Sequence, residues 1–180
     1  MIADPQTVLA FWRSAGPEKW FKKDTAFDDD IRRRFLETYE AVAAGQLAGW
    51  EQSAENALAL AIVLDQFPRN MFRGSPRAFG TDPKALMLAR GMVDRGMDLA
   101  LQHRQRPFIY LPFEHSEQLA DQERSVGLFA AHGDANALKY AVAHHAIIAR
   151  FGRFPHRNAA LGRASTPEEI AFLETPGSSF

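Results

Sequence analysis

The sequence contains no cysteine, which excludes disulfides, thiolate metal sites and a cysteine nucleophile. It has no excess of charge of either sign, because 21 Lys and Arg residues are balanced by 22 Asp and Glu residues. The net charge of −1 gives no basic surface, so we expect no nucleic-acid partner. The nearest approach to a membrane span is the apolar run 57–64, far short of the ~20 residues required. The N-terminus lacks the basic and apolar segments of a secretion signal. These absences predict a soluble cytoplasmic protein with no membrane partner.

Alternating strand patterns are nearly absent as well, whereas signals for helix starts recur along the chain. Acidic or hydroxyl side chains precede proline or an apolar periodic run at each of these starts. We expect seven helices joined by short connections, beginning near Asp4, Asp28, Ser53, Thr81, Glu114, Ala135 and Thr166. This pattern predicts an all-α single domain over residues 1–180, with helices in antiparallel pairs and a short tail at 175–180.

The third expected helix is apolar all round from Ala57 to Leu64, so it should lie at the centre of the domain. Pro68 disfavours helical geometry at Phe67, and we expect this helix to end or kink there. The apolar connector 108–111, between two prolines, could be mistaken for a strand, but no other segment has strand character to pair with it.

Three blocks combine charged, imidazole and aromatic side chains more densely than a helical core requires. They span residues 65–70, 111–117 and 150–158, and each sets Arg, His or a carboxylate beside a Phe-Pro or Pro-Phe pair. Buried polar groups are costly unless they are paired. The blocks therefore predict either an internal network of ion pairs or a ligand site.

Two histidines lie on the helix expected from Ala135 to Phe151. At 100° per residue, His144 and His145 point to different sides, both among apolar residues. Burial would lower a histidine pKa unless a carboxylate holds the charge. Each ring either makes a structural hydrogen bond or takes part in ligand binding or proton transfer. Because the rings diverge by ~100° and no HExxH motif is present, we expect no metal site.

Glu114, Glu117, Asp121 and Arg124 recur at spacings of three, four and three, so a helix would place them in one stripe. The stripe is either a solvated face or, with His115 beside it, part of a site. The block 150–158 adds several arginines to this set, and Gly152 and Pro155 shape the loop that carries them. Guanidinium groups suit carboxylates or phosphates, so these arginines bind either internal carboxylates or an anionic ligand. Nucleophile-elbow, phosphate-loop and dinucleotide-binding motifs are absent.

The three blocks resemble a known bacterial family. The segments DQFPRNMFRG, YLPFEHSEQLADQERSV and RFGRFPHRNAALGR are similar to signature segments of the uncharacterised family called domain of unknown function 924. The N-terminal segment FWRSAGPEKWFKKDTAFDDDIRRRF resembles the opening of that family too. The resemblance implies a tetratricopeptide-like, right-handed array of helix pairs and no established activity.

Two functions remain open. The favoured hypothesis is a helical binding or interaction module with an Arg- and His-rich site for a small anionic ligand or an acidic peptide end, without a cofactor. The alternative is an enzyme that acts on a phosphorylated or carboxylated metabolite, with His115, Glu114 or His144 as acid or base. The expected ligand-binding residues are Asp65, Arg69, Asn70, Arg73, Glu117, Asp121, His145, Arg150, Arg153, His156, Arg157 and Asn158.

Overall fold

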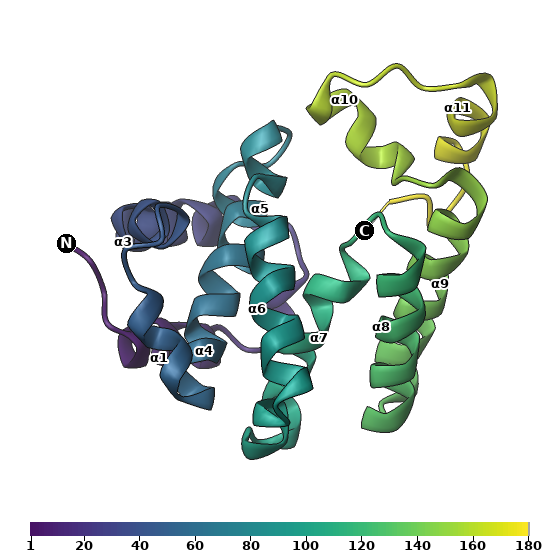
Figure 1. Ribbon diagram of the computed structural model, residues 1–180. Coiled ribbons are helices and arrows are strands. Elements are labelled where there is room, and N and C mark those ends of the chain that lie inside the picture. Colours follow the sequence, from purple (N-terminus) through teal and green to yellow (C-terminus); the bar gives the residue numbers. More distant parts are fainter. Residues whose placement is uncertain (180) are drawn as a thin grey trace. The chain divides into compact units, whose positions relative to one another are not determined.

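The structure, a computed structural model, describes residues 1–179 and contains helices and no strands within them (Figure 1). The α-helices are α1 Pro5–Ala15, α2 Pro17–Trp20, α3 Thr25–Ala43, α4 Ala54–Ala61, α5 Phe67–Met71, α6 Asp82–Asp94, α7 Pro107–Glu114, α8 Leu119–His132, α9 Ala135–Phe151, α10 Asn158–Leu161 and α11 Pro167–Leu173. Short 3-10 helices lie at Ala48–Gln52, Pro76–Phe79, Met97–Ala100, His103–Gln105 and Pro155–Arg157. The all-α prediction is confirmed, but seven helices are too few. Prolines at 17 and 107, which punctuate the sequence, open additional helices because proline suits the first helical turn.

The chain divides into two compact units. Unit 1 comprises Met1–Arg73 and Arg77–Pro112, and unit 2 comprises Gly74–Pro76 and Phe113–Phe180. Helices α1 to α6 belong to unit 1 and α8 to α11 to unit 2, while the division falls within α7. A single domain over the whole chain stays a prediction.

Side-chain caps explain where several helices begin. Asp4 Oδ1 accepts a hydrogen bond of 2.9 Å from the Thr7 N–H, and Pro5 opens α1 as expected. The second expected helix begins earlier than Asp28, because Asp24 caps α3 through the Phe27 N–H. At the last helix, Thr166 and Glu169 form a reciprocal capping box.

The central helix of unit 1 does not end at Phe67 but continues to Met71, and its geometry changes just before Phe67. A π-helical segment, Ile62–Gln66, connects α4 directly to α5, and Phe67 has helical φ and ψ values of −58° and −42°. The wider π turn admits Pro68, which has no N–H to offer the preceding turn. The Leu64 carbonyl instead accepts a 2.6 Å hydrogen bond from the Thr81 hydroxyl. Thr81 therefore supports the π segment rather than capping α6 with its side chain.

Apolar packing in unit 1 centres on this continuous helix. Residues 57–64 are all buried, which confirms the prediction of a central helix. The Phe67 ring lies 4.8 Å from the Phe35 ring and 5.8 Å from Trp12, as measured between centroids. Burial of each such ring contributes about 1.5–3 kcal/mol to folding. Phe21, by contrast, is 70% exposed.

Unit 2 is built on the helix pair α8 and α9, which lie side by side (Figure 1). The bounds of α9 agree with the prediction, because Asp134 caps its first turn and Gly152, at φ 67°, ends it. The helix expected from Glu114 is wrong at its start: α7 ends at Glu114 and α8 begins only at Leu119. The acidic stripe is therefore not one helix face.

Candidate functional site

The predicted site residues of unit 1 form two ion-pair groups around the π segment. Arg69 binds Asp82 through two hydrogen bonds of 2.8 and 3.0 Å, and its Nη1 lies 3.3 Å from Asp65 Oδ1. The same Nη1 donates a 2.6 Å hydrogen bond to the Asp65 carbonyl. Burial opposes the charge on Arg69, but Asp65 and Asp82 raise its pKa above the ordinary value. This guanidinium holds the backbone and the acidic side chains of the π segment together.

The second group joins the end of α5 to the start of α3. Asn70 Nδ2 donates a 2.7 Å hydrogen bond to Asp28 Oδ1, and Arg73 Nε lies 2.5 Å from Asp28 Oδ2. The sequence reading names Asn70 and Arg73 but misses Asp28 and Asp82 as partners. Asp82 is visible only as a helix-start residue, and Asp28 only as one acidic residue in a run of three.

In unit 2, two arginines near the end of α9 bind carboxylates of the same unit. Arg153 makes two hydrogen bonds, of 2.6 and 2.7 Å, with Glu169. Hydrogen bonds from Arg153 and from the Thr166 N–H lower the pKa of Glu169 to about 2. Arg150 lies 2.8 Å from Glu168 in an exposed pair. Both glutamates follow Thr166 at the start of the last helix, and the capping-box spacing of Thr166 and Glu169 is a sequence signal for an anchored carboxylate.

Glu117 lies in the connection between α7 and α8, where it binds the loop after α9. Its carboxylate accepts two hydrogen bonds from Arg163, of 2.8 and 2.9 Å, and one of 2.8 Å from the Phe154 N–H. Burial raises the pKa of Glu117, but Arg163 and the Phe154 N–H outweigh it and leave the pKa below its usual value. The predicted link between the second and third blocks therefore exists, although its arginine is Arg163, which is not among the expected ligand-binding residues.

Three other predicted ligand-binding residues of unit 2 are Asn158, Asp121 and His145. Asn158 donates hydrogen bonds to Ser165, at 3.0 Å, and to Glu169, at 3.3 Å. Asp121 accepts a 2.7 Å hydrogen bond from the Ser116 hydroxyl. His145 is only partly buried, so its side of α9 is more open than we expect.

The structure brings together the other imidazoles, one carboxylate and one arginine in unit 2. His144 and Phe154 have ring centroids 5.5 Å apart, and the same distance separates Phe154 from His156. The Arg157 guanidinium lies 4.4 Å from the centroid of the Phe154 ring, and the His115 ring lies 6.4 Å from His144. We call this group the histidine cluster; its members are Glu114, His115, His144, His156 and Arg157, of which the last three lie against Phe154.

His144 is the most deeply placed imidazole of the histidine cluster, at 4% exposed. Its Nδ1 lies 2.9 Å from the Tyr140 carbonyl and 3.2 Å from Glu114 Oε1. Burial lowers the pKa of His144 to about 3, although the hydrogen bond to Tyr140 acts in the opposite direction. With this pKa the ring is neutral at pH 7. Since only an Nδ1–H suits the two neighbouring oxygens, Nε2 is the basic nitrogen.

Three neighbouring side chains of the histidine cluster also affect the pKa of His144 through their charge. His115, Arg157 and His156 each act to lower the pKa of His144, because their positive charge disfavours a second one. His115 and His156 are partly exposed, whereas Glu114 and Arg157 are buried. The partly exposed imidazoles are the members that solvent reaches.

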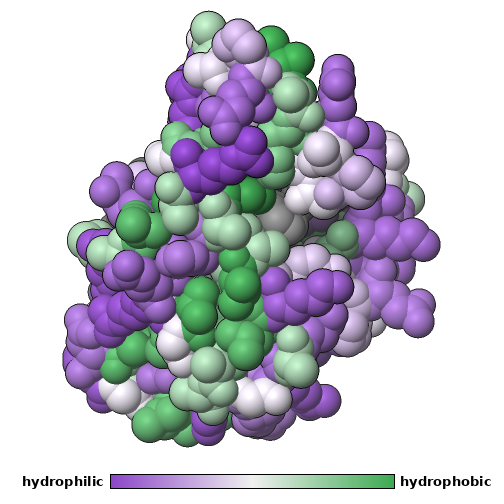
Figure 2. Space-filling view, turned by 90° about the vertical axis from the view of Figure 1, so that its right-hand side faces the viewer, coloured by the Kyte–Doolittle hydropathy of each residue, from purple (hydrophilic) through white to green (hydrophobic). Residues whose placement is uncertain are grey.

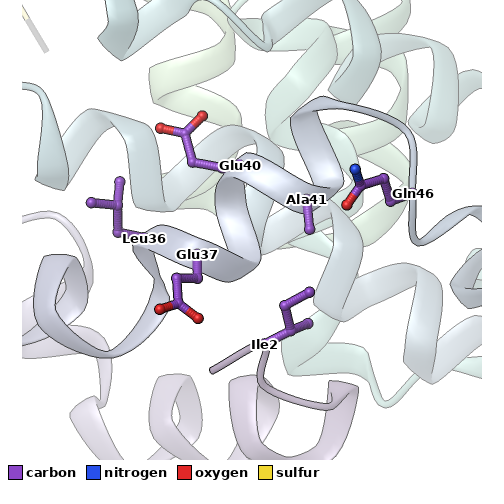
Figure 3. A pocket seen from close by; sticks show the side chains of 6 residues that line it. All are labelled: Ile2, Leu36, Glu37, Glu40, Ala41 and Gln46. Atoms are coloured by element: carbon purple, nitrogen blue, oxygen red, sulfur yellow. The ribbon is translucent and has the colours of Figure 1, made fainter.

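A hollow in unit 1 lies elsewhere, between the N-terminal segment and α3, and has a volume of about 430 Å3. Figure 3 shows Ile2 of the N-terminal segment below α3, with Glu37 and Glu40 on the helix beside it. Glu37 binds the Met1 amino group and Glu40 binds Arg77. None of the residues that line this hollow belongs to the predicted site; they are Ile2, Leu36, Glu37, Glu40, Ala41 and Gln46.

Other surface features do not define a second site. Among residues 1–179, no group of three or more His, Asp or Glu side chains is placed to hold a metal ion. Within the same residues, no helix has the length and apolar character needed to cross a membrane. In Figure 2, hydrophobic residues gather near the centre of one face and are bordered by hydrophilic ones. Scattered apolar side chains such as Tyr140 and Val142 are exposed in unit 2, which is ordinary for a folded protein.

Residues 8–177 match the family described as a bacterial protein of unknown function, DUF924. The chain belongs to this family. A solved structure of a protein of unknown function from Agrobacterium tumefaciens, ATU0120, is 46% identical, with a TM-score of 0.91. The similarity covers 94% of this chain and 96% of that one. A search among curated proteins finds no match. The family resemblance read from the three sequence blocks is thus confirmed.

Proposed function

We propose that this DUF924 protein binds a small anionic ligand, a phosphate or a carboxylate, at the histidine cluster of unit 2. The observation that carries the proposal is the gathering of His144, His156 and the Arg157 guanidinium about Phe154, with His115 beside His144. Arginine and histidine N–H groups are strong donors to anionic oxygens, and burial strengthens each interaction. His115 and His156 would meet the ligand first because they are partly exposed.

The ion pairs narrow the set of ligand-binding residues from the twelve expected. Arg69, Arg73, Arg150 and Arg153 bind carboxylates of the chain, so their role in the proposal is to hold the fold. Arg157 stacks on the ring at the middle of the histidine cluster and is 6% exposed. We assign the ligand to Arg157 and the neighbouring imidazoles because Arg157 and His156 lie against the Phe154 ring and His156 is partly exposed.

The proposal is tested with inorganic phosphate and the full chain, by following the histidine ring signals in NMR and the heat of binding in calorimetry. We expect shifts at His115 and His156 and a loss of binding of at least tenfold in Arg157→Gln, because a charge-assisted hydrogen bond contributes about 1.5–3 kcal/mol. Arg157→Lys keeps the charge of the buried side chain and is expected to fold and to bind with intermediate affinity.

Arg150→Gln is the matched control for this experiment. It removes one positive charge from the same unit, but Arg150 belongs to an exposed pair with Glu168. Phosphate affinity should be unchanged in this variant. Absence of phosphate binding in the parent protein, or equal weakening by Arg150→Gln and Arg157→Gln, would contradict the anion site.

A second candidate function is acid–base catalysis on a phosphorylated or carboxylated metabolite, favoured by the 3.2 Å contact of Glu114 with His144. A carboxylate that orients a neutral imidazole is the arrangement of a general base. The pKa of about 3 makes His144 a weak base near pH 7, which favours binding over catalysis. A metabolite screen that finds turnover with a bell-shaped pH profile, abolished by His115→Gln, would reverse this preference.

The arrangement of the helices and the cellular location are also proposed on the basis of the sequence. The right-handed tetratricopeptide-like array is supported by the pairing of α8 with α9 across the turn at Gly133 and Asp134. The cytoplasmic location and the absence of nucleic-acid and membrane partners stay predictions from composition.

A further inference from the structure

Gln122 of α8 has a fixed side-chain amide. Its Nε2 donates to the carbonyls of Glu114 and Ser116, both at 2.6 Å, and approaches the Phe113 carbonyl at 3.4 Å. A flipped amide would set Oε1 against these three carbonyl oxygens, so the orientation is determined. The amide therefore holds the segment that supplies Glu114 and His115 to the histidine cluster.

This orientation leaves Oε1 of Gln122 buried without a hydrogen-bond donor. One turn further along α8, the hydroxyl of Ser125 is also buried without a partner. Both residues are 0% exposed, and they share the buried face of a helix that packs along α9, which carries His144. An unsatisfied buried polar group costs about 1–3 kcal/mol. Two neighbouring ones on the same helix face therefore favour a bound molecule that forms hydrogen bonds with both.

A molecule that binds Gln122 must donate a hydrogen bond, because Gln122 Oε1 can only accept one. We propose that the ligand of the histidine cluster carries a hydroxyl or ammonium group close to its anionic group, and that Gln122 Oε1 and the Ser125 hydroxyl bind this donor. The inference rests on the proposed anion site and specifies the ligand further. The ligand class is then that of hydroxy- or amino-alkyl phosphates and of hydroxy or amino acids.

The test compares three probes with the full chain: ethyl phosphate, 2-hydroxyethyl phosphate and phosphoethanolamine. We expect one donor-bearing probe to bind at least about fivefold more tightly than ethyl phosphate, which corresponds to one net hydrogen bond. The hydroxyl and ammonium probes distinguish the two kinds of donor. Equal affinities for all three probes would overturn the inference and leave the anion site standing. Failure of all three, and of inorganic phosphate, would overturn the anion site itself.

Ser125→Ala provides a variant that should fold as well as the parent, because it removes a buried hydroxyl that has no partner. We expect it to reduce the advantage of the donor-bearing probe and to leave ethyl phosphate affinity unchanged. Ser14→Ala, an exposed position of unit 1, is the matched control and should preserve the full advantage. An unchanged ratio in Ser125→Ala would show that the donor is recognised elsewhere and would overturn the assignment.

Discussion

The two units contain similar polar residues but arrange them differently. In unit 1, Arg69 lies between Asp65 and Asp82 and also binds the backbone of the π segment, so its charge stabilises the fold. In unit 2, the histidine cluster places positive groups about one ring, with Glu114 in contact with His144. Arginines bind carboxylates in both units, as Arg153 and Glu169 do in unit 2, so the difference between the units is the gathering of imidazoles in the histidine cluster.

The largest effect is expected when the Arg69 guanidinium of unit 1 is removed. Arg69→Met should lower the free energy of unfolding by about 3–5 kcal/mol, because it leaves Asp65 and Asp82 without their cation. Urea denaturation measures the loss. Arg33→Met, which removes an exposed partner of Asp30, should cost less than about 0.5 kcal/mol. Similar losses in both variants would show that the Arg69 network is not the stabilising feature of unit 1.

Acid should weaken unit 2 through His144. Its pKa is lowered to about 3 in the folded state, so the unfolded chain binds a proton first as the pH falls below the ordinary histidine pKa of 6.5. The contribution of this ring is thus present above pH 6.5 and declines by up to about 1.4 kcal/mol per pH unit between 6.5 and 3.

Denaturation at pH 7.0 and 5.0 tests this dependence, with NMR titration of the His144 ring as the direct measure. His144→Gln should reduce the pH dependence, whereas His103→Gln, in unit 1, should leave it intact. A His144 ring that titrates near pH 6.5 in the folded protein would contradict the prediction.

The π segment of unit 1 can be tested at Thr81. Thr81→Val removes the hydroxyl that donates to the Leu64 carbonyl, and we expect a loss of about 1–3 kcal/mol because a buried acceptor is left without its donor. Thr81→Ser retains the hydroxyl and should lose less. Thermal unfolding compares the two variants, and equal losses would mean that packing, not the hydrogen bond, explains the effect.

The smallest expected effect concerns the exposed pair of Arg150 and Glu168. Arg150→Gln should change the free energy of unfolding by less than about 0.5 kcal/mol, since both side chains are more than half exposed. Urea denaturation of the variant beside the parent checks this. A larger loss would show that the loop after α9 depends on surface ion pairs.

Several helix starts can be predicted directly from the order of residues in the sequence. The caps at Asp4 and Asp134 are local, because each reaches only two or three residues along the chain. Local signals therefore predict these starts and the all-α class. Pro68 shows the limit of such reasoning: its effect on the helix depends on Thr81, which is distant in sequence and supplies the hydrogen bond that allows the π turn.

The candidate site shows the same limit. The sequence offers Glu114, His115 and His144 as candidate acid–base groups, and the structure places Glu114 and His115 beside His144. It does not identify Gln122, because a glutamine within an apparent helix gives no sign that its amide is fixed by three carbonyls. The acidic stripe fails for a related reason, since the connection between α7 and α8 separates Glu117 from the face that periodicity predicts.

By itself, the amino-acid order determined the helical class, the buried central helix and the types of polar group available. Only the tertiary structure decided which groups meet: Arg73 reaches Asp28 across 45 positions, and Arg163 reaches Glu117 across 46. Helical periodicity fixes which side of a helix a residue faces, but an ion pair forms only where packing brings two side chains within about 4 Å. That distance depends on the arrangement of helices, which local sequence patterns do not specify.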